Sequence, residues 1–123
     1  MSQNKISNTH TFYKLLCFRL RTSELAYKTY LNERTYATAN VILFINKEII
    51  AFIRENIFYA KNLDVDSLTE LVLHFSGWIS DFELQVKKLS PEPNSIFIFE
   101  RSKGLFSYPK EFIAKLYVDW YKQ

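Results

Sequence analysis

The chain contains 123 residues, of which 48% are hydrophobic and 17% are aromatic. A chain of this length and composition can fold around one core without disulfides or metals, and its composition argues against intrinsic disorder. The two glycines are too few for a glycine-rich phosphate-binding loop, and the single cysteine, Cys17, excludes an intramolecular disulfide or a multi-cysteine zinc site. We therefore predict a single domain over residues 1–123 in a reducing cytoplasm, with residues 1–8 as a flexible polar tail that lacks a secretory signal.

Charge is distributed unevenly along the chain, although the formal net charge is only +3. Residues 1–62 contain nine Lys or Arg against four Asp or Glu, whereas residues 63–123 contain seven against nine. The first half is therefore basic and the second half is mildly acidic. This asymmetry is more informative about partners than the total charge is.

Two amphipathic helices are predicted in the first part of the chain. The first begins at Thr9 and has apolar residues at helical spacing. Its apolar positions are Phe12, Leu15, Leu16 and Leu20. Thr22 and Ser23 offer N-cap oxygens for a second helix that runs toward Asn32. No proline or glycine marks a boundary near residues 32–35, so the second helix and the next one could be bent parts of one long helix, although length favours a break there.

The longest apolar run, Val41–Ala60, predicts the central helix of the fold. Its polar interruptions recur at seven-residue spacing, which places them on one narrow stripe of a helix. This stripe consists of Asn40, Lys47, Arg54 and Lys61, with Glu48, Glu55 and Asn62 one position further on. Charged residues enter well before the roughly 20 apolar residues that a bilayer requires, so we do not expect a membrane span. We predict a helix over about residues 35–62, covered by other helices, with Lys47 and Arg54 in solvent.

A second strongly amphipathic helix is predicted after a short connector. Ser67 and Glu70 have the spacing of a capping box, in which each side chain accepts from the other residue's backbone N–H. The apolar stripe that follows comprises Leu68, Leu71, Val72, Phe75, Ile79, Phe82, Val86 and Leu89. Gly77 interrupts this helix at a cost of about 1 kcal/mol relative to Ala, for which close approach of another backbone is one reason. Pro91 and Pro93 end the helix.

Extended structure is predicted after these prolines. Ser95–Glu100 is rich in β-branched and aromatic residues and is bounded by turn formers, which is typical of a strand. Leu105–Tyr108 could return as its partner, which predicts a short β-hairpin or extended segment near residues 95–108 that packs on the helices. Pro109 then opens a last helix. The predicted fold class is mainly α, a compact helical bundle around the central helix.

Few residues in the sequence could support catalysis. His10 and His74 have no metal-ligand spacing with each other or with Cys17. No serine-centred elbow or HExxH motif occurs, and Asp81 and Glu83 are two residues apart, so they lie on different helix faces. We therefore expect a protein that is not an enzyme and has no metal or cofactor.

An acidic group around the predicted capping box is the first candidate binding surface. Negative charge at a helix N-terminus is stabilising in itself, so Asp66 and Glu70 also have a structural explanation. In the functional interpretation, complementary charge speeds the association of a basic partner while aromatic side chains supply affinity. The residues of this candidate partner-binding surface are Asp64, Asp66, Glu70, His74, Trp78 and Asp81.

A basic group in the first two predicted helices is the alternative binding surface. Its members are Lys14, Arg19, Arg21, Lys28 and Arg34, which are interleaved with tyrosines. Basic side chains neutralise phosphates and aromatic rings stack on bases, which would suit single-stranded DNA or RNA. The positive residues are spread over several turns, so an ordinary solvated helix face is the competing interpretation.

The segment from Leu71 to Tyr117 carries a family resemblance. FSGWISDFELQV, SPEPNSIFIFE and SYPKEFIAKLY follow one another there. This pattern resembles the C-terminal half of small immunity proteins from bacterial polymorphic-toxin and contact-dependent growth inhibition systems, over less than half of the chain. The resemblance implies a stoichiometric binder that blocks a cognate toxin, commonly a nuclease, and that has no catalytic residues.

Two functional hypotheses follow from the sequence. The first is a small helical protein that neutralises a cognate toxin domain by occluding its active site, without membrane association. The alternative is a phage or mobile-element protein that binds nucleic acid, or inhibits a nucleic-acid-targeting defence complex, through the basic face of its first two helices.

Overall fold

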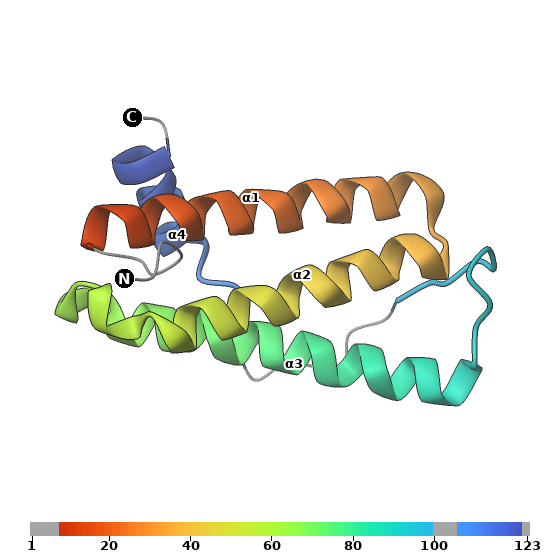
Figure 1. Ribbon diagram of the computed structural model, residues 1–123. Coiled ribbons are helices and arrows are strands. Elements are labelled where there is room, and N and C mark those ends of the chain that lie inside the picture. The colour runs from red at the N-terminus through yellow and green to blue at the C-terminus, as the bar shows by residue number, and fades with distance from the viewer. Residues whose placement is uncertain (1–7, 100–105, 122–123) are drawn as a thin grey trace, which may run out of the picture.

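The computed structural model describes residues 8–99 and 106–121. Three long helices, α1, α2 and α3, lie alongside one another, and α4 packs at the end of the bundle where α1 begins (Figure 1). The helices are α1 (Thr9–Glu33), α2 (Tyr36–Glu55), α3 (Val65–Leu89) and α4 (Lys110–Leu116). Two 3-10 turns, η1 (Ile57–Tyr59) and η2 (Asn62–Asp64), connect α2 to α3, and a π-helical turn, η3 (Tyr117–Tyr121), extends α4. The predicted mainly α bundle is confirmed.

α1 is one continuous helix, so the predicted helix boundary at Thr22 and Ser23 is wrong. Thr22 Oγ1 donates to the Phe18 carbonyl one turn earlier, at 2.8 Å. Ser23 Oγ donates to Oδ1 of Asn46 on α2, at 2.9 Å. Hydroxyl side chains can bond to a preceding turn or to another helix without ending their own helix. The predicted start at Thr9 is confirmed.

Local geometry defines both ends of α1. Asn8 Oδ1 accepts from the backbone N–H three residues further on, at 2.7 Å, so Asn8 caps the helix and is not part of the predicted tail. The rest of that tail, residues 1–7, lies outside the described residues. At the other end, Arg34 has left-handed backbone (φ 55°) and its N–H donates to the Tyr30 carbonyl at 2.6 Å. The break that length favoured near residues 32–35 is therefore confirmed.

α2 packs between α1 and α3 and forms the centre of the bundle, as predicted (Figure 1). It ends at Glu55, earlier than the predicted residue 62. The next residue, Asn56, turns its side chain back, and its Nδ2 donates to the Phe52 carbonyl at 2.9 Å. This bond occupies a carbonyl at the helix end and coincides with the change to 3-10 geometry.

Two basic residues of the polar stripe, Lys47 and Arg54, face solvent, as predicted. Lys47 and Arg54 are both exposed, and Lys47 Nζ lies 3.0 Å from the Glu83 carboxylate on α3. Arg54 also borders an otherwise uncharged hollow of about 360 Å³ between α2 and α3. One polar residue next to the stripe behaves differently, because Asn46 is only 2% exposed.

Among the described helices, α2 is the one that is long and apolar enough to cross a membrane by length and composition, with a mean hydropathy of 1.4. A core helix of a bundle meets the same criterion. Ile42, Ile49 and Ile53 of α2 are buried inside the bundle. The outer side of α2 nevertheless exposes Val41 and Phe44.

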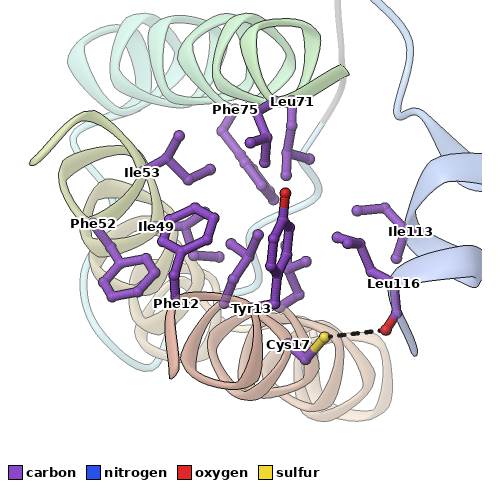
Figure 2. Packing of buried hydrophobic residues seen from close by; sticks show 13 residues of the cluster. Phe12, Tyr13, Cys17, Ile49, Phe52, Ile53, Leu71, Phe75, Ile113 and Leu116 are labelled. Atoms are coloured by element: carbon purple, nitrogen blue, oxygen red, sulfur yellow. Dashed lines mark hydrogen bonds between the residues drawn. The ribbon is translucent and has the colours of Figure 1, made fainter. Parts of the chain in front are cut away.

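The main core lies where all four helices meet, at the end of the bundle near α4 (Figure 2). Phe12 of α1 stacks on Phe52 of α2, with ring centroids 5.5 Å apart. Ile113 and Leu116 of α4 close this cluster from the side. Each large apolar side chain that is fully buried contributes about 1.5–3 kcal/mol, so α4 is an integral part of the fold despite its length. A second cluster, around Phe82, fills the opposite end.

α3 begins at Val65, so the predicted capping box at Ser67 is wrong. Ser67 lies inside the first turn, and Asp64 precedes the helix. η2 leads directly into α3 through an Asp64 N–H to Lys61 carbonyl bond of 2.9 Å, while the Asp64 carboxylate accepts from the Tyr13 hydroxyl at 2.5 Å. The predicted apolar stripe is confirmed for most of its length, with Leu68, Leu71, Phe75 and Phe82 buried, Val72, Ile79 and Val86 half-buried and only Leu89 exposed.

The predicted β-hairpin is wrong for the described residues. Ser95–Phe99 is extended but forms only one isolated bridge, between Thr35 and Ile96, and residues 100–105 lie outside the described part of the chain. The predicted alternation does occur, because Phe97 is buried whereas Ile96 is 72% exposed. An alternating pattern requires only that one face of the extended segment is buried and the other is exposed. Packing against helices can bury that face as well as packing within a sheet can.

The backbone of this segment bonds to α1 and its C-terminal cap, where a strand would bond to a partner strand. The Phe97 N–H donates to the Arg34 carbonyl at 2.7 Å. The Tyr30 hydroxyl donates to the Phe97 carbonyl at 2.6 Å and accepts from the Phe99 N–H at 2.9 Å. These partners, which are distant in sequence, satisfy backbone N–H and carbonyl groups that a second strand would satisfy in a sheet.

We predict that folded protein resists alkylation of Cys17 by iodoacetamide at about pH 8. Cys17 is fully buried, its Sγ lies 3.6 Å from the Leu116 carbonyl, and burial raises the pKa of the thiol to about 11. Reactive thiolate is therefore scarce and shielded, so mass spectrometry should show labelling only as fast as the chain unfolds.

The same thiol adds a pH dependence to stability. Its folded-state pKa lies above the unfolded value of about 8.5, so the contribution of the thiol to stability is present below about pH 8.5 and is lost as the pH rises toward 11.

In the alkylation experiment, equally fast labelling of Cys17 with and without denaturant would contradict its buried position.

Candidate functional site

A pocket of about 530 Å³ opens between α1 and α3. Ligand pockets have volumes of roughly 300–1,000 Å³, so this space can hold a small molecule or an inserted side chain. Most of its lining is apolar, and its polar lining residues include Arg21, Glu24 and Lys28 from α1, Asn46 from α2, His74 from α3, and Tyr108. We treat this pocket as one candidate site and the outward side of α3 as another.

Asn46 supplies a buried polar group to the pocket wall. Its Oδ1 accepts from the Ser23 hydroxyl at 2.9 Å, and this bond joins α2 to α1. A buried amide without a partner costs about 1–3 kcal/mol, so Ser23 offsets part of the cost of placing Asn46 in the interior. The sequence predicted an N-cap role for Ser23 and no role for Asn46, and only the packing of α1 against α2 brings the two residues together.

Glu24 connects α1 to the C-terminal turn η3. Its Oε1 lies 3.1 Å from Arg21 Nη1, and its Oε2 accepts from the Tyr117 hydroxyl at 2.6 Å. Burial and the bond to Glu24 raise the pKa of Tyr117, so its hydroxyl remains a neutral donor at physiological pH. Glu24 is therefore a structural carboxylate with two intramolecular partners.

His74 and Tyr108 contribute an aromatic edge to the pocket. Their ring centroids lie 5.2 Å apart in an edge-to-face arrangement, and His74 Nδ1 lies 3.2 Å from the Phe106 carbonyl oxygen. Burial, and then the negative charge of Glu24, raise the pKa of Tyr108. Its hydroxyl is consequently a neutral hydrogen-bond donor rather than a phenolate base.

The described residues contain no group of three or more His, Cys, Asp or Glu that could hold a metal ion. His10 packs edge-on against Trp120 at 5.7 Å, His74 packs against Tyr108, and Cys17 is in the core. These three side chains therefore lie in three different environments. The pocket can form hydrogen bonds and apolar contacts, which are means of recognition.

The predicted acidic surface is only partly assembled by the structure. Asp66 and Glu70 are exposed, while His74 and Asp81 are half-buried. Asp64 accepts from the Tyr13 hydroxyl and so holds η2 against α1. Trp78 is 7% exposed and stacks on Phe82 with ring centroids 5.1 Å apart, which places it in the core rather than on the surface.

Two leucines extend the exposed part of this surface. Leu73 is 37% exposed and Leu84 is 57% exposed, and both lie outside the predicted apolar stripe. Helical periodicity places them on the same outward side of α3 as Asp66 and Glu70. We call this surface the acidic face of α3 and define it as Asp66, Glu70, Leu73, Asp81 and Leu84. The signal was present in the sequence, as two leucines that do not fit the core stripe.

The predicted basic group does not form one continuous surface. The Arg19 guanidinium lies over the Phe52 ring at 4.3 Å from its centroid, and that of Arg34 lies over Tyr30 at 5.6 Å. Lys14, Arg21 and Lys28 recur every seven residues, which places these three on one side of α1. They lie next to exposed Phe18 and Leu25 on the same helix.

No known protein family, curated protein or solved structure was found to match this chain.

We predict that Glu24→Gln lowers the free energy of unfolding by about 1 kcal/mol, because it removes the charge that holds Arg21 and Tyr117 at a partly exposed position. Urea denaturation followed by circular dichroism measures this difference. The pKa of Tyr117 should also fall toward its ordinary value, which ultraviolet titration detects. Glu48→Gln, at an exposed position on α2, is the matched control, and equal losses in both variants would contradict the structural role of Glu24.

Proposed function

We propose that this protein binds a cognate toxin domain and neutralises it by occluding its active site. The observation that carries the proposal is the acidic face of α3, where exposed leucines and carboxylates share one side of a rigid helix. The resemblance of residues 71–117 to immunity proteins supports the same interpretation. The proposed partner surface is basic, as the substrate-binding cleft of a nuclease is.

The two kinds of side chain on this face have different tasks. Exposed Asp66 and Glu70 attract a basic partner and set its orientation, which mainly affects the association rate. Leu73 and Leu84 provide apolar area that leaves water when the partner docks. Gly77 lies between them on the same side of α3, where the missing side chain allows a partner to approach the helix backbone.

The acidic face of α3 is held in position by the buried residues on the opposite side of the helix. Leu68, Leu71 and Phe75 are buried against the rest of the bundle, so α3 cannot rotate without losing core contacts. Binding through a pre-formed helix avoids the entropic cost of ordering a loop. A stoichiometric inhibitor benefits from this rigidity because all of its activity depends on affinity.

The first test asks whether the gene immediately upstream encodes a toxin domain, and co-expresses the protein with that domain. The wild-type chain should rescue growth and co-purify with that domain in equal amounts. Asp66→Lys combined with Glu70→Lys should weaken binding at least about tenfold in calorimetric titration, because attraction becomes repulsion.

Glu48→Lys combined with Glu55→Lys is the matched control, because it makes the same change in net charge at exposed positions on α2. This control should bind like the wild type. Failure to bind or rescue with the neighbouring domain would count against toxin neutralisation, and equal losses in both double variants would place the contact elsewhere.

Nucleic-acid binding is the second candidate, and the alignment of Lys14, Arg21 and Lys28 on one side of α1 favours it. Three phosphate contacts to a single strand predict that the logarithm of the binding constant falls with the logarithm of salt with a slope of about −2. Fluorescence anisotropy with labelled oligo-dT and oligo-U measures this slope.

Lys14→Gln combined with Lys28→Gln should reduce both the affinity and the slope in that measurement. Lys87→Gln combined with Lys88→Gln, at the exposed end of α3, serves as the control. Absence of binding at low salt would remove the nucleic-acid hypothesis.

A further inference from the structure

The wall of the pocket between α1 and α3 contains an amide donor, the Nδ2 group of Asn46. Asn46 is 2% exposed, and its Oδ1 accepts from Ser23 Oγ at 2.9 Å. Among the described residues no acceptor is bonded to Asn46 Nδ2, and none of their fully buried side-chain nitrogens or oxygens lacks a partner, so Nδ2 borders the open space of the pocket that Asn46 lines. A ligand in the pocket that supplies an acceptor oxygen can therefore form a hydrogen bond with this amide.

Tyr108 provides a second donor in the same lining. Its ring is held edge-on to His74 and to Phe75, at centroid distances of 5.2 and 6.2 Å. Among residues 8–99 and 106–121, no partner is found for its hydroxyl group. The hydroxyl stays protonated at neutral pH, so it also donates.

The pocket lining carries two positive charges, on Arg21 and Lys28, against one negative charge, on Glu24. Glu24 is the carboxylate in the lining, and it already has Arg21 at 3.1 Å and the Tyr117 hydroxyl at 2.6 Å as partners. Lys28 is exposed in the same lining and adds a positive charge. Because Glu24 is already paired, Lys28 is the charged group of this lining for which no partner is found among the described residues.

The apolar part of the lining sets the shape of the ligand. Phe75 and Trp78 are buried, and Trp78 packs against Phe99 with ring centroids 5.0 Å apart. Aromatic walls favour a flat apolar group that can stack or pack edge-on. A volume of about 530 Å³ accommodates a bicyclic ring with a short polar substituent.

We propose that this pocket binds a small carboxylate with a flat apolar body. The body packs against Phe75, Trp78 and Phe99, and the carboxylate oxygens accept from Asn46 and Tyr108 opposite the charge of Lys28. The pocket lies on a different flank of α3 from its acidic face, so this inference does not rest on toxin binding.

The test uses 2-naphthoate as the probe, with 2-naphthamide and 2-naphthylmethylamine as neutral and cationic analogues of the same shape. Isothermal titration calorimetry on the full chain should rank the anion about tenfold above the amide, with the amine weakest. In nitrogen-15 spectra, the side-chain amide signals of Asn46 should shift on addition of 2-naphthoate. Absence of binding up to about 1 mM would overturn the proposal, since that limit corresponds to only about 4 kcal/mol of affinity.

Two variants separate this pocket from non-specific binding. Tyr108→Phe removes one hydroxyl and should weaken 2-naphthoate binding about tenfold or more. Ser23→Ala combined with Asn46→Leu removes both partners of a buried bond, so the core keeps no unpaired group while the donor is lost. Its folding is checked by thermal unfolding, and Tyr108→Phe decides the outcome if this variant does not fold.

Tyr59→Phe is the matched control for Tyr108→Phe, because Tyr59 is half-buried at η1 and does not line the pocket. It should bind 2-naphthoate as the wild type does. Unchanged affinity in the Tyr108 variant, or an equal loss in the Tyr59 variant, would show that the probe binds elsewhere and would overturn the assignment.

Discussion

The fold depends on two buried tyrosine hydroxyl groups of α1, one toward each end of the bundle. Tyr13 donates to Asp64 and accepts from the Lys61 N–H, so it holds the connection between α2 and α3. Tyr30 donates to and accepts from the backbone of residues 97–99, so it holds the chain that follows α3. Each hydroxyl uses both its donor and its acceptor on a segment that is distant in sequence, which offsets the cost of burying the phenol.

These attachments explain why α3 has two usable sides. The extended segment anchored by Tyr30 places Phe99 against Trp78 and covers part of one flank of α3. The pocket lies along that flank, between α1 and α3. The outward side of α3 has no such cover in the described structure, and Asp66 and Glu70 remain exposed there. Ligand binding in the pocket and partner binding on the acidic face can therefore be tested separately.

Periodicity predicted the buried stripe of α3 better than it predicted helix boundaries or the contacts between helices. The stripe from Leu68 to Val86 was predicted residue by residue, because burial on one side leaves a period of 3.6 in the sequence. The alternation around Phe97 was also predicted, but the segment pairs with no strand among the described residues, since its backbone partners include Arg34 and the Tyr30 hydroxyl. The sequence around Ser23 suggests a helix cap because capping is the local use of a hydroxyl group, whereas in the structure Ser23 bonds to Asn46 on another helix.

The sequence by itself determined the mainly α class, the central position of α2, the solvent-facing stripe with Lys47 and the absence of an obvious catalytic motif. Only the tertiary structure decided that Trp78 is buried, that Asn46 meets Ser23, and that a pocket with available donors lies between α1 and α3. The physical reason is that a hydrophobic pattern specifies which side of a helix is buried, while the rotation and register of the neighbouring helices specify what that side touches. Side-chain hydrogen bonds between residues far apart in the sequence depend on this rotation and register. The candidate site could therefore not be assembled from residue spacing alone.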